Sequence, residues 1–333
     1  MARVAIHGFG RIGRTALRIA LQNNLFTPVA ISDIKDASTL AALFAVDTNY
    51  GRWHEQVESN DGKGFVIGGR EIPYFNTAQS LPDWGNMGID LVIDCTGRAT
   101  TRAGAEAHLN CGAKRVLVSA PSKSLQDCDV VLLPGINLEQ YKPAEHRIVS
   151  MGSCTTNALA PVVKVLHENW GIESAFFSTI HAYTNSQSLT DQPMKDLRDS
   201  WAAAENIIPS SSGAAKTLLF VWKDLKITGK AYRVPTRTGS IAEVNAVVKK
   251  SATADAIKDA FRKAAGEAPL KGVMDVLEGE WASSRIVADS HSSIIDLPLV
   301  QVMNDNLVSV AAWYDNEWGY TSRLAEMGAW LNQ

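Results

Sequence analysis

Short apolar runs alternate with amphipathic stretches through the first half of the chain. Runs rich in β-branched and aliphatic residues, which are typical of strands, lie at 3–8, 28–33, 90–95, 115–120 and 129–134. Helical patterns lie at 11–24, 37–47 and 100–113. Because strands and helices alternate, the pattern favours a mostly parallel sheet with helices on both faces. The first half therefore predicts an α/β domain.

The pattern changes near residue 150. Helical spacing runs from Cys154 to Trp170, and Pro161 either lies in the first turn of this helix or kinks it. Further strand-like runs lie at 173–184, 230–236, 240–250 and 306–315, and further helical patterns at 253–266 and 320–333. This second half predicts an α+β domain with a mostly antiparallel sheet.

Length and composition narrow the class of protein. At about 150 residues per domain, a chain of 333 residues predicts two domains. The formal net charge of -3 gives no general attraction to nucleic acid or to an anionic membrane. No apolar run approaches the roughly 20 residues that span a bilayer. The chain enters a strand-like pattern at once, without the features of a signal peptide, so we expect a cytoplasmic protein.

The four cysteines, Cys95, Cys111, Cys128 and Cys154, do not form an evident framework. None has the close pairing with histidine that a zinc site needs, so we expect no metal. Four cysteines in so long a chain are also too few for a disulfide scaffold. We expect most of them to be buried as small apolar residues. Cys154 is the candidate exception, because small and hydroxyl-bearing residues surround it.

Three glycines, Gly8, Gly10 and Gly13, have the spacing G-x-G-x-x-G between the first strand-like run and the first helix. Such glycines allow a tight turn and the close approach of a pyrophosphate to free amides at the helix N-terminus. Asp33 ends the second strand-like run, where a carboxylate accepts both ribose hydroxyls of NAD and repels the 2'-phosphate of NADP. The pattern predicts a Rossmann domain that binds NAD; the alternative is a packing turn and a capping aspartate.

Cys154 and His181 are candidates for a nucleophile and its base. A helix N-terminus and a nearby imidazole both lower the pKa of a thiol, and the amides of Thr155 and Thr156 would be available to an oxyanion. A helix followed by a returning strand can bring His181 beside the sulfur. Taken alone, however, these two residues are more often a capped helix and a core histidine.

Hydroxyl groups and cations follow at Thr184, Arg198, 209–216 and Arg233. Serine, glycine and arginine together suit a phosphate oxyanion, because backbone amides and a guanidinium donate charge-assisted hydrogen bonds to it. Individually, each of these residues is more often a cap, a turn or a surface charge.

Six motifs together resemble the phosphorylating glyceraldehyde-3-phosphate dehydrogenase family over essentially the whole chain. They are GFGRIGR, SCTTN, HAYTN, IIPSSSGAAK, RVPT and WYDNEWGY, in the family's order and at its spacing. The resemblance implies a homotetramer. It also implies an NAD-binding domain at residues 1–151, completed by a C-terminal helix at 317–333, and a catalytic domain at residues 152–316.

The resemblance further implies the chemistry. Cys154 would add to the aldehyde of glyceraldehyde 3-phosphate, and His181 would activate the thiol as a base and stabilise the alkoxide. Hydride transfer from the thiohemiacetal to NAD would leave a thioester. Inorganic phosphate would then attack the thioester and release an acyl phosphate, 1,3-bisphosphoglycerate.

The motif positions also imply the binding residues. Thr184 and Arg233 match residues that hold the substrate phosphate. The positions that contribute to the sites for inorganic phosphate are Ser153, Thr155, Arg198, Ser212 and Gly213. The positions that match cofactor contacts are Gly8, Gly10, Arg11, Ile12, Gly13, Asp33, Thr96, Ser119 and Asn316, the last of which addresses the nicotinamide amide.

Some positions depart from the family's usual residues. His7 stands in place of asparagine, Ser186 in place of aspartate and Ser212 in place of threonine. The nearest alternative function is that of erythrose-4-phosphate dehydrogenase, a relative with the same fold and thiol that favours hydrolysis of the thioester. The stretch SSSGAAK argues for phosphorolysis instead.

Two alternatives come from other classes of protein. A thiol hydrolase with an accidental glycine loop would leave Asp33 and Asn316 unexplained. A catalytically idle family member that only binds or regulates is disfavoured by the intact Cys154 and His181.

Overall fold

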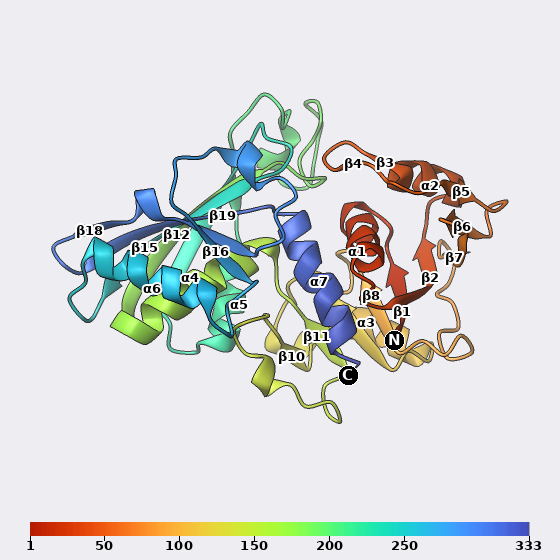
Figure 1. The fold of residues 1–333 in the computed structure, drawn as a ribbon. Coiled ribbons are helices and arrows are strands. Elements are labelled where there is room, and N and C mark those ends of the chain that lie inside the picture. Colours follow the sequence, from red (N-terminus) through yellow and green to blue (C-terminus); the bar gives the residue numbers. More distant parts are fainter. Residues whose placement is uncertain (333) are drawn as a thin grey trace. The chain divides into compact units, whose positions relative to one another are not determined.

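The computed structural model describes residues 1–332 and divides into two compact units, each with its own sheet (Figure 1). The first unit comprises Met1–Leu132, Glu139–Gly152 and the residues from Thr321 on. The second comprises Leu133–Leu138 and Ser153–Tyr320. No helix in the described part of the chain combines the length and apolar character needed to cross a membrane.

A nine-stranded sheet forms the centre of the first unit, in the order β10-β11-β9-β8-β1-β2-β7-β6-β5. Its strands are β1 (Arg3–His7), β2 (Thr27–Asp33), β5 (Val57–Ser59), β6 (Gly64–Ile67), β7 (Arg70–Asn76), β8 (Leu91–Asp94), β9 (Arg115–Val118), β10 (Val130–Val131) and β11 (Ile148–Ser150). Neighbouring strands are parallel except at one edge, where β6 runs antiparallel to β5 and β7. A separate short pair consists of β3 (Val46–Asp47) and β4 (Gly51–Arg52).

The helices of this unit are α1 (Arg11–Gln22), α2 (Ala37–Ala45), α3 (Arg102–Asn110) and most of α7 (Trp318–Trp330). Successive residues of β1 belong to two different cores. Ile6 packs with Leu17 of α1 and Phe44 of α2, whereas Ala5 belongs to a cluster that contains Trp84. Because side chains alternate along a strand, the two cores lie on opposite faces of the sheet. The predicted Rossmann-type sheet is confirmed.

An eight-stranded sheet forms the second unit, in the order β13-β14-β12-β15-β19-β17-β16, with β18 paired to β19. Its strands are β12 (Ile172–Ala182), β13 (Ile208–Ser211), β14 (Ile227–Val234), β15 (Ser240–Val248), β16 (Met274–Leu277), β17 (Ser293–Asp296), β18 (Gln301–Met303) and β19 (Leu307–Tyr314). Only the pairs β12 with β14 and β16 with β17 are parallel. The predicted α+β unit with a mostly antiparallel sheet is confirmed.

Three helices of this unit, α4 (Cys154–Trp170), α5 (Ala214–Val221) and α6 (Ala254–Gly266), pack together. Helix α4 contacts β12, β15, β17 and β19 as well as the other two helices. The burial of β12 alternates accordingly: Phe177 and Thr179 are buried, whereas Phe176 and Ile180 are exposed. The helices therefore cover one face of this sheet. On its other face, apolar side chains of β12 are exposed to solvent in the single chain.

The structure differs from the sequence predictions at several points. Pro161 lies inside α4, beyond its first turn, where it removes only one backbone hydrogen bond from a long and well-packed helix. All four cysteines are free, and Cys128 alone is buried, because Cys95 and Cys111 directly follow the ends of β8 and α3. The strands at residues 46–76 and helix α5 were not predicted. Strands β3 to β6 have two to four residues each and therefore little periodicity, and Pro73 lies within the longer β7.

Candidate active site

Cys154 is the first residue of α4, and its neighbours fix the start of this helix. The hydroxyl of Ser153 accepts a hydrogen bond from the amide of Thr156 at 3.1 Å, and the hydroxyl of Thr156 accepts one from the amide of Ser153 at 3.3 Å. This reciprocal capping box holds the first turn. The amides of Cys154 itself and of Thr155 interact with the sulfur and favour its anion.

Strands β12 and β14 bring His181 and Arg233 to the thiol. The strands are parallel and pair His181 with Arg233 in register, so both side chains emerge on the same face. His181 Nε2 lies 3.4 Å from Cys154 Sγ. His181 is buried, and Cys154 and Arg233 are half-buried. Three residues far apart in the sequence thus form one cluster.

The Nδ1 atom of His181 has two competing neighbours. It lies 2.7 Å from the carbonyl oxygen of Ala182 and 2.5 Å from Nη1 of Arg233. A carbonyl oxygen can only accept a hydrogen bond and a guanidinium can only donate one. Burial, and then the positive charge of Arg233, lower the pKa of His181 to about 3. His181 is therefore neutral in this state at neutral pH.

The thiol is also neutral in this state. Burial raises the pKa of Cys154, and the opposing effects of Arg233 and of the donors of Thr155 do not overcome it. The expectation that the surroundings lower the pKa of Cys154 is therefore wrong. The physical reason is that desolvation disfavours the thiolate while the neutral imidazole supplies no compensating charge.

A buried tyrosine that the sequence analysis did not single out supports both residues. The hydroxyl of Tyr314, at the end of β19, lies 3.0 Å from Thr155 Oγ1 and 2.8 Å from Thr179 Oγ1. Its ring meets the ring of His181 edge-on, with the centroids 5.9 Å apart. These contacts join α4, β12 and β19. Only the position of Tyr314 within WYDNEWGY could have indicated this role.

Asn316 lies just beyond β19 and is linked to the residue next to His181 by two hydrogen bonds through Ser240. Its Oδ1 accepts a hydrogen bond from the hydroxyl of Ser240 at 2.9 Å. The hydroxyl of Ser240 in turn accepts one from the amide of Ala182, next to His181, at 3.1 Å. Ser240 is a second supporting residue that the sequence analysis missed, because one serine at the start of a strand has no distinctive pattern.

Thr184 begins the loop that follows β12. Its amide and hydroxyl donate to Oε1 of Gln187 at 3.0 and 3.2 Å, and its hydroxyl lies 2.7 Å from that of Ser186. Gln187 also donates to Asp199 at 2.9 Å. Gln187 therefore holds the side chain of Thr184 in place, three residues after His181 in the sequence. Gln187 was not among the predicted site residues.

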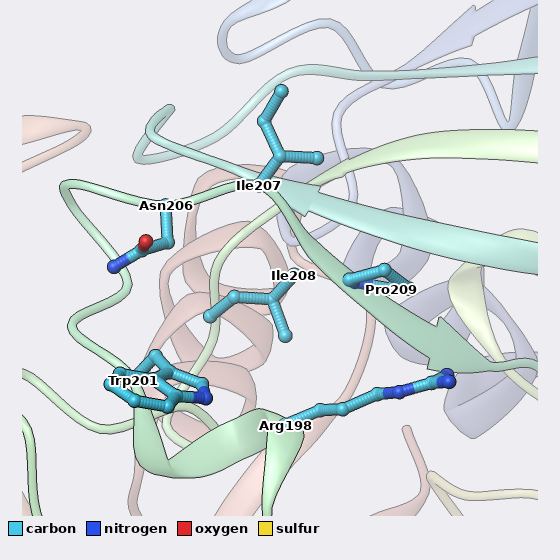
Figure 2. A pocket seen from close by; sticks show the side chains of 6 residues that line it. All are labelled: Arg198, Trp201, Asn206, Ile207, Ile208 and Pro209. Atoms are coloured by element: carbon cyan, nitrogen blue, oxygen red, sulfur yellow. The ribbon is translucent and has the colours of Figure 1, made fainter.

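Arg198 lines a pocket of about 410 Å³ in the same unit (Figure 2). The other lining residues are Trp201, Asn206, Ile207, Ile208 and Pro209. Figure 2 shows the Arg198 side chain extending beneath Pro209 toward β13. The guanidinium is thus presented beside a mostly apolar surface.

Ser212 and Gly213 follow β13 at the start of α5. The hydroxyl of Ser212 accepts a hydrogen bond from the amide of Ala214 at 3.3 Å, and Gly213 is the N-cap of the helix. Among residues 1–332, no hydrogen bond or ion pair joins Arg198, Ser212 or Gly213 to Cys154. The structure therefore brings Cys154, His181 and Arg233 into direct contact. Within the described part of the chain, it shows no such contact of Arg198, Ser212 or Gly213 with Cys154.

In the first unit, the glycine loop has the geometry that its sequence indicates. Gly8 has a φ of +87°, and a Cβ there would lie 2.8 Å from Thr96, while a Cβ on Gly13 would lie 2.2 Å from the carbonyl oxygen of Gly8. Around Gly10, the N-cap of α1, no atom lies within 4 Å of the place that a Cβ would take. The amides of the first turn have no partner within the helix. This open N-terminus fits a pyrophosphate.

Asp33 ends β2 next to this loop. Its two carboxylate oxygens accept hydrogen bonds from the amides of Phe9 at 2.6 Å and Lys35 at 3.0 Å. The guanidinium of Arg11 forms a bidentate ion pair with Asp47 at 2.5 and 3.1 Å, so its charge is engaged within the fold. Arg11 and the half-buried Ile12 therefore offer backbone amides rather than a free cation at the start of α1.

Asp94, at the end of β8, positions two more of the predicted cofactor residues. Its carboxylate accepts hydrogen bonds from the amide and the hydroxyl of Thr96 at 2.9 and 2.7 Å. Its carbonyl oxygen accepts one from the amide of Ser119 at 2.9 Å. Burial alone would raise the pKa of Asp94, but the hydrogen bonds from His108 and Thr96 outweigh it, so the pKa is lowered.

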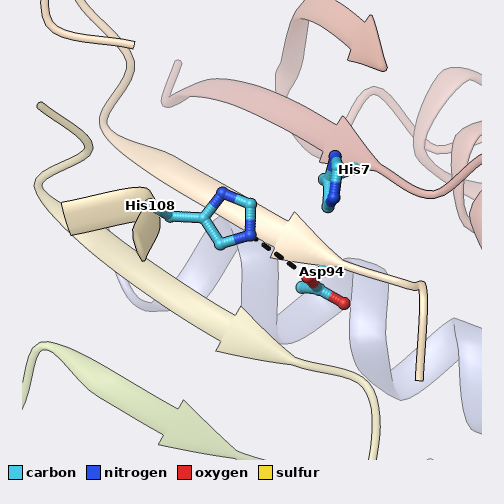
Figure 3. Close-up of side chains that lie close together, drawn as sticks. All are labelled: His7, Asp94 and His108. Carbon is cyan, nitrogen blue, oxygen red and sulfur yellow. Dashed lines mark hydrogen bonds and ion pairs between the residues drawn. The ribbon is translucent and has the colours of Figure 1, made fainter. Parts of the chain in front are cut away.

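Asp94 also belongs to a cluster with His7 and His108, whose possible ligand atoms lie within 4.8 Å of one another (Figure 3). The indole of Trp84 donates to His108 Nδ1 at 3.2 Å, so the proton of this imidazole is on Nε2, which donates to Asp94 at 3.1 Å. A zinc-ligating histidine needs an acceptor rather than a donor at its other nitrogen. The cluster is therefore a hydrogen-bond network and not a fit for a metal ion.

Two family models match the chain. The model described as "Glyceraldehyde 3-phosphate dehydrogenase, NAD binding domain" matches residues 2–102. The model described as "Glyceraldehyde 3-phosphate dehydrogenase, C-terminal domain" matches residues 153–316. The first match contains the glycine loop, and the second contains the cluster of Cys154, His181 and Arg233.

Curated proteins match over nearly the whole chain. "Glyceraldehyde-3-phosphate dehydrogenase" of Kitasatospora aureofaciens is 44% identical over 332 residues, which cover 98% of each chain. The protein of the same name from Geobacillus stearothermophilus is 42% identical over 334 residues, or 99% of this chain and 98% of the relative. That of Mycobacterium avium is 44% identical over 337 residues, or 98% and 97%. The chain therefore belongs to the glyceraldehyde-3-phosphate dehydrogenase family.

Proposed function

We propose that this protein catalyses the NAD-dependent oxidative phosphorylation of glyceraldehyde 3-phosphate to 1,3-bisphosphoglycerate, a reaction of glycolysis. The observation that carries the proposal is the 3.4 Å contact between Cys154 Sγ and His181 Nε2 at the N-terminus of α4. A thiol next to a base is the arrangement of a covalent nucleophile. Membership of the family supplies the substrate.

In this proposal, Cys154 loses its proton to His181 as the sulfur adds to the aldehyde carbon and forms a thiohemiacetal. His181 and the amides at the start of α4 donate to the oxygen that becomes negative. Bound NAD supplies the hydride acceptor for oxidation of this adduct to a thioester. Inorganic phosphate then attacks the thioester carbon, the carbon–sulfur bond breaks, and Cys154 is regenerated.

We assign the substrate phosphate to Arg233 and Thr184. Buried Arg233 Nε has no hydrogen-bond partner, although a buried donor is costly to leave unpaired. A phosphate oxygen would satisfy this donor. We assign inorganic phosphate to donors contributed by Ser153, Thr155, Arg198, Ser212 and Gly213.

We assign NAD binding to residues 1–151 with the helix at 317–333, and catalysis to residues 152–316. The open helix N-terminus at Gly10 and the carboxylate of Asp33 support this assignment. The residues that would hold NAD are Gly8, Gly10, Arg11, Ile12, Gly13, Asp33, Thr96, Ser119 and Asn316. The carboxylate of Asp33 favours NAD over NADP, because it would repel a 2'-phosphate.

A homotetramer is part of the proposal. Two apolar surfaces of the second unit support it: the uncovered sheet face with Phe176, and the segment at 189–207, where Leu189 is 78% and Leu197 75% exposed. Exposed apolar surface of this kind marks sites of association. We also propose a cytoplasmic location, which suits a protein with four free cysteines.

The test is to measure NADH formation from glyceraldehyde 3-phosphate with and without inorganic phosphate. Sustained turnover should require phosphate, and erythrose 4-phosphate should be the poorer substrate. The comparisons do not support the erythrose-4-phosphate dehydrogenase alternative. Phosphate-independent turnover that favours erythrose 4-phosphate would nevertheless restore it, and thiol-dependent ester hydrolysis without NADH would indicate a hydrolase.

A further inference from the structure

Gln187 is the centre of a closed set of hydrogen bonds in the loop that follows β12. Its side chain is buried, with 7% exposed. Oε1 accepts hydrogen bonds from the amide of Thr184 at 3.0 Å and from its hydroxyl at 3.2 Å. Nε2 donates to Oδ1 of Asp199 at 2.9 Å and to the hydroxyl of Ser186 at 3.2 Å. Both ends of the buried amide are therefore fully paired.

Two of these partners fix which way the side-chain amide of Gln187 points. A backbone amide can only donate a hydrogen bond, so the atom that faces the amide of Thr184 must be the oxygen. A carboxylate can only accept, so the atom that faces Asp199 must be the nitrogen. A flipped side chain would set donor against donor and acceptor against acceptor. Asp199 therefore ensures that an acceptor faces Thr184.

The orientation of Gln187 also places the hydroxyl hydrogens. Because Oε1 only accepts, the hydroxyl of Thr184 donates its single hydrogen to Gln187. The 2.7 Å bond between the hydroxyls of Ser186 and Thr184 must then be donated by Ser186. The side chains of Gln187, Ser186 and Thr184 thus form a ring in which each donates to the next. Hydrogen bonds arranged in this way strengthen one another.

This ring can release one hydrogen bond at little cost. If the hydroxyl of Thr184 turns to an anion, Oε1 of Gln187 still accepts from the amide of Thr184, so no buried atom loses its last partner. The hydroxyl of Ser186 continues to donate to Thr184 and makes its hydrogen a better donor. Thr184 follows β12 at the end of the sheet where β14 carries Arg233. The released hydrogen is therefore offered at the same end of the sheet as the guanidinium.

We propose that Gln187 and Asp199 are positioning residues for the phosphoryl group of the substrate. Asp199 orients the side-chain amide of Gln187, and this amide holds Thr184 so that its hydroxyl donates to the phosphoryl group when the substrate binds. The inference rests on the proposed function, because it takes Thr184 as a ligand of this group. Asp199 acts through Gln187, and Gln187 acts through Thr184.

The backbone holds Asp199 in position for this role. Asp199 belongs to the short 3-10 helix Arg198–Ser200, and its amide donates to the carbonyl oxygen of Asp196 at 3.1 Å. Its own carbonyl oxygen accepts a hydrogen bond from the amide of Ser188, the residue after Gln187, at 2.9 Å. The two segments are thus joined by a backbone bond as well as by the bond between the side chains of Gln187 and Asp199.

A purely electrostatic role of Asp199 predicts a different result. A negative charge close to the phosphoryl group would only oppose the binding of an anion, so any neutral residue at position 199 would strengthen binding. If Asp199 instead orients Gln187, a neutral residue that keeps an acceptor should preserve binding, and an apolar residue should weaken it. The variants Asp199→Asn and Asp199→Leu separate the two accounts.

The test compares the oxidation of a phosphorylated aldehyde with that of its unphosphorylated form. The quantity measured is the ratio of kcat/KM for glyceraldehyde 3-phosphate to kcat/KM for glyceraldehyde, at saturating NAD and inorganic phosphate. Asp199→Leu and Gln187→Met should lower this ratio by about two- to tenfold, the worth of one hydrogen bond, mainly by raising KM for the phosphorylated substrate.

Two control variants should keep the ratio close to that of the wild type. Asp199→Asn retains an acceptor for Gln187, and Gln192→Met changes an exposed glutamine of the same segment. An unchanged ratio in Asp199→Leu and Gln187→Met would overturn the inference. A ratio that rises in both Asp199 variants would also overturn it, in favour of the electrostatic account.

A double variant shows whether the effect passes through Thr184. In the Thr184→Val background, Gln187→Met should lower the ratio no further, because the hydroxyl that it positions is absent. A second loss of equal size would contradict the inference. If Gln187→Met does not fold, the two Asp199 variants decide.

Failure of the proposed function would be visible separately. If the wild type prefers erythrose 4-phosphate and needs no inorganic phosphate, the proposed function is wrong. The same ratio is then measured with erythrose 4-phosphate and erythrose, which differ by the same phosphoryl group, and it decides the inference by the same criteria.

Discussion

Two buried histidines, His108 in the first unit and His181 in the second, have different hydrogen-bond partners. The donor and the acceptor of His108 each meet a complementary partner: Trp84 donates to Nδ1, and Nε2 donates to Asp94. Nδ1 of His181 meets a donor and an acceptor at once, and its Nε2 faces a thiol. A satisfied network stabilises a fold, whereas competing partners allow a group to change state. The comparison favours a structural role for His108 and supports the chemical role that we propose for His181.

The largest expected effect comes from removing the imidazole of His181. His181→Asn should lower kcat by about 10²- to 10⁴-fold, the usual contribution of a general acid–base. At about pH 7.5, where His181 is mostly neutral in both the folded and the unfolded chain, the free energy of unfolding of this variant should stay within about 1 kcal/mol of the wild type. Steady-state NADH formation and urea unfolding measure the two quantities. Full activity would show that His181 is not the base.

Removing the imidazole of His108 should lower stability and leave activity nearly unchanged. His108→Ala leaves the buried donor of Trp84 and an oxygen of Asp94 without partners, each of which costs about 1 to 3 kcal/mol of stability. With saturating NAD, the activity per folded molecule should change little. His54→Ala, at an exposed position of the same unit, is the control and should cost less than about 0.5 kcal/mol. Equal losses of stability in His108→Ala and His54→Ala would show that His108 has no special structural role.

A smaller effect concerns the dependence of stability on pH. Because the pKa of His181 falls from 6.5 to about 3 on folding, the unfolded chain binds one more proton between these values. Stability should therefore fall as pH falls, by about 1.4 kcal/mol per unit from this residue alone. Burial also lowers the pKa of His7, which adds to the slope.

The unfolding of His181→Asn and His7→Asn at fixed protein concentration, over a range of pH below 6.5, separates these contributions. His181→Asn should have the shallower slope of the two. A slope equal to that of the wild type would mean that His181 is not held neutral in the folded protein.

Local patterns account for the parts of the fold that sequence could predict. The strands and helices around the glycine loop are regular, and the positive φ of Gly8 and the close approach at Gly13 explain the residues chosen there. The start of α4 is marked by Ser153 and by the residues around Cys154. These features depend on neighbours in the chain, so the sequence displays them directly.

Features that depend on strand pairing were not predictable in this way. The contact of His181 with Arg233 comes from the register of two parallel strands, and the support from Tyr314 and Ser240 comes from strands further along the chain. The neutral state of Cys154 depends on how far the assembled site excludes water. The family's motifs identified residues, but not how their charges and protons are arranged.

The most direct test of the account is to look for its covalent intermediate. The protein is mixed with NAD and glyceraldehyde 3-phosphate without inorganic phosphate, quenched in acid and digested for mass spectrometry. The account predicts one phosphoglyceryl group on the peptide that contains Cys154, formed with a matching amount of NADH and removed when phosphate is added before quenching. The Cys154→Ser variant should form neither while still binding NAD. NADH formation without an adduct on Cys154, or an adduct on Cys95, Cys111 or Cys128 instead, would contradict it.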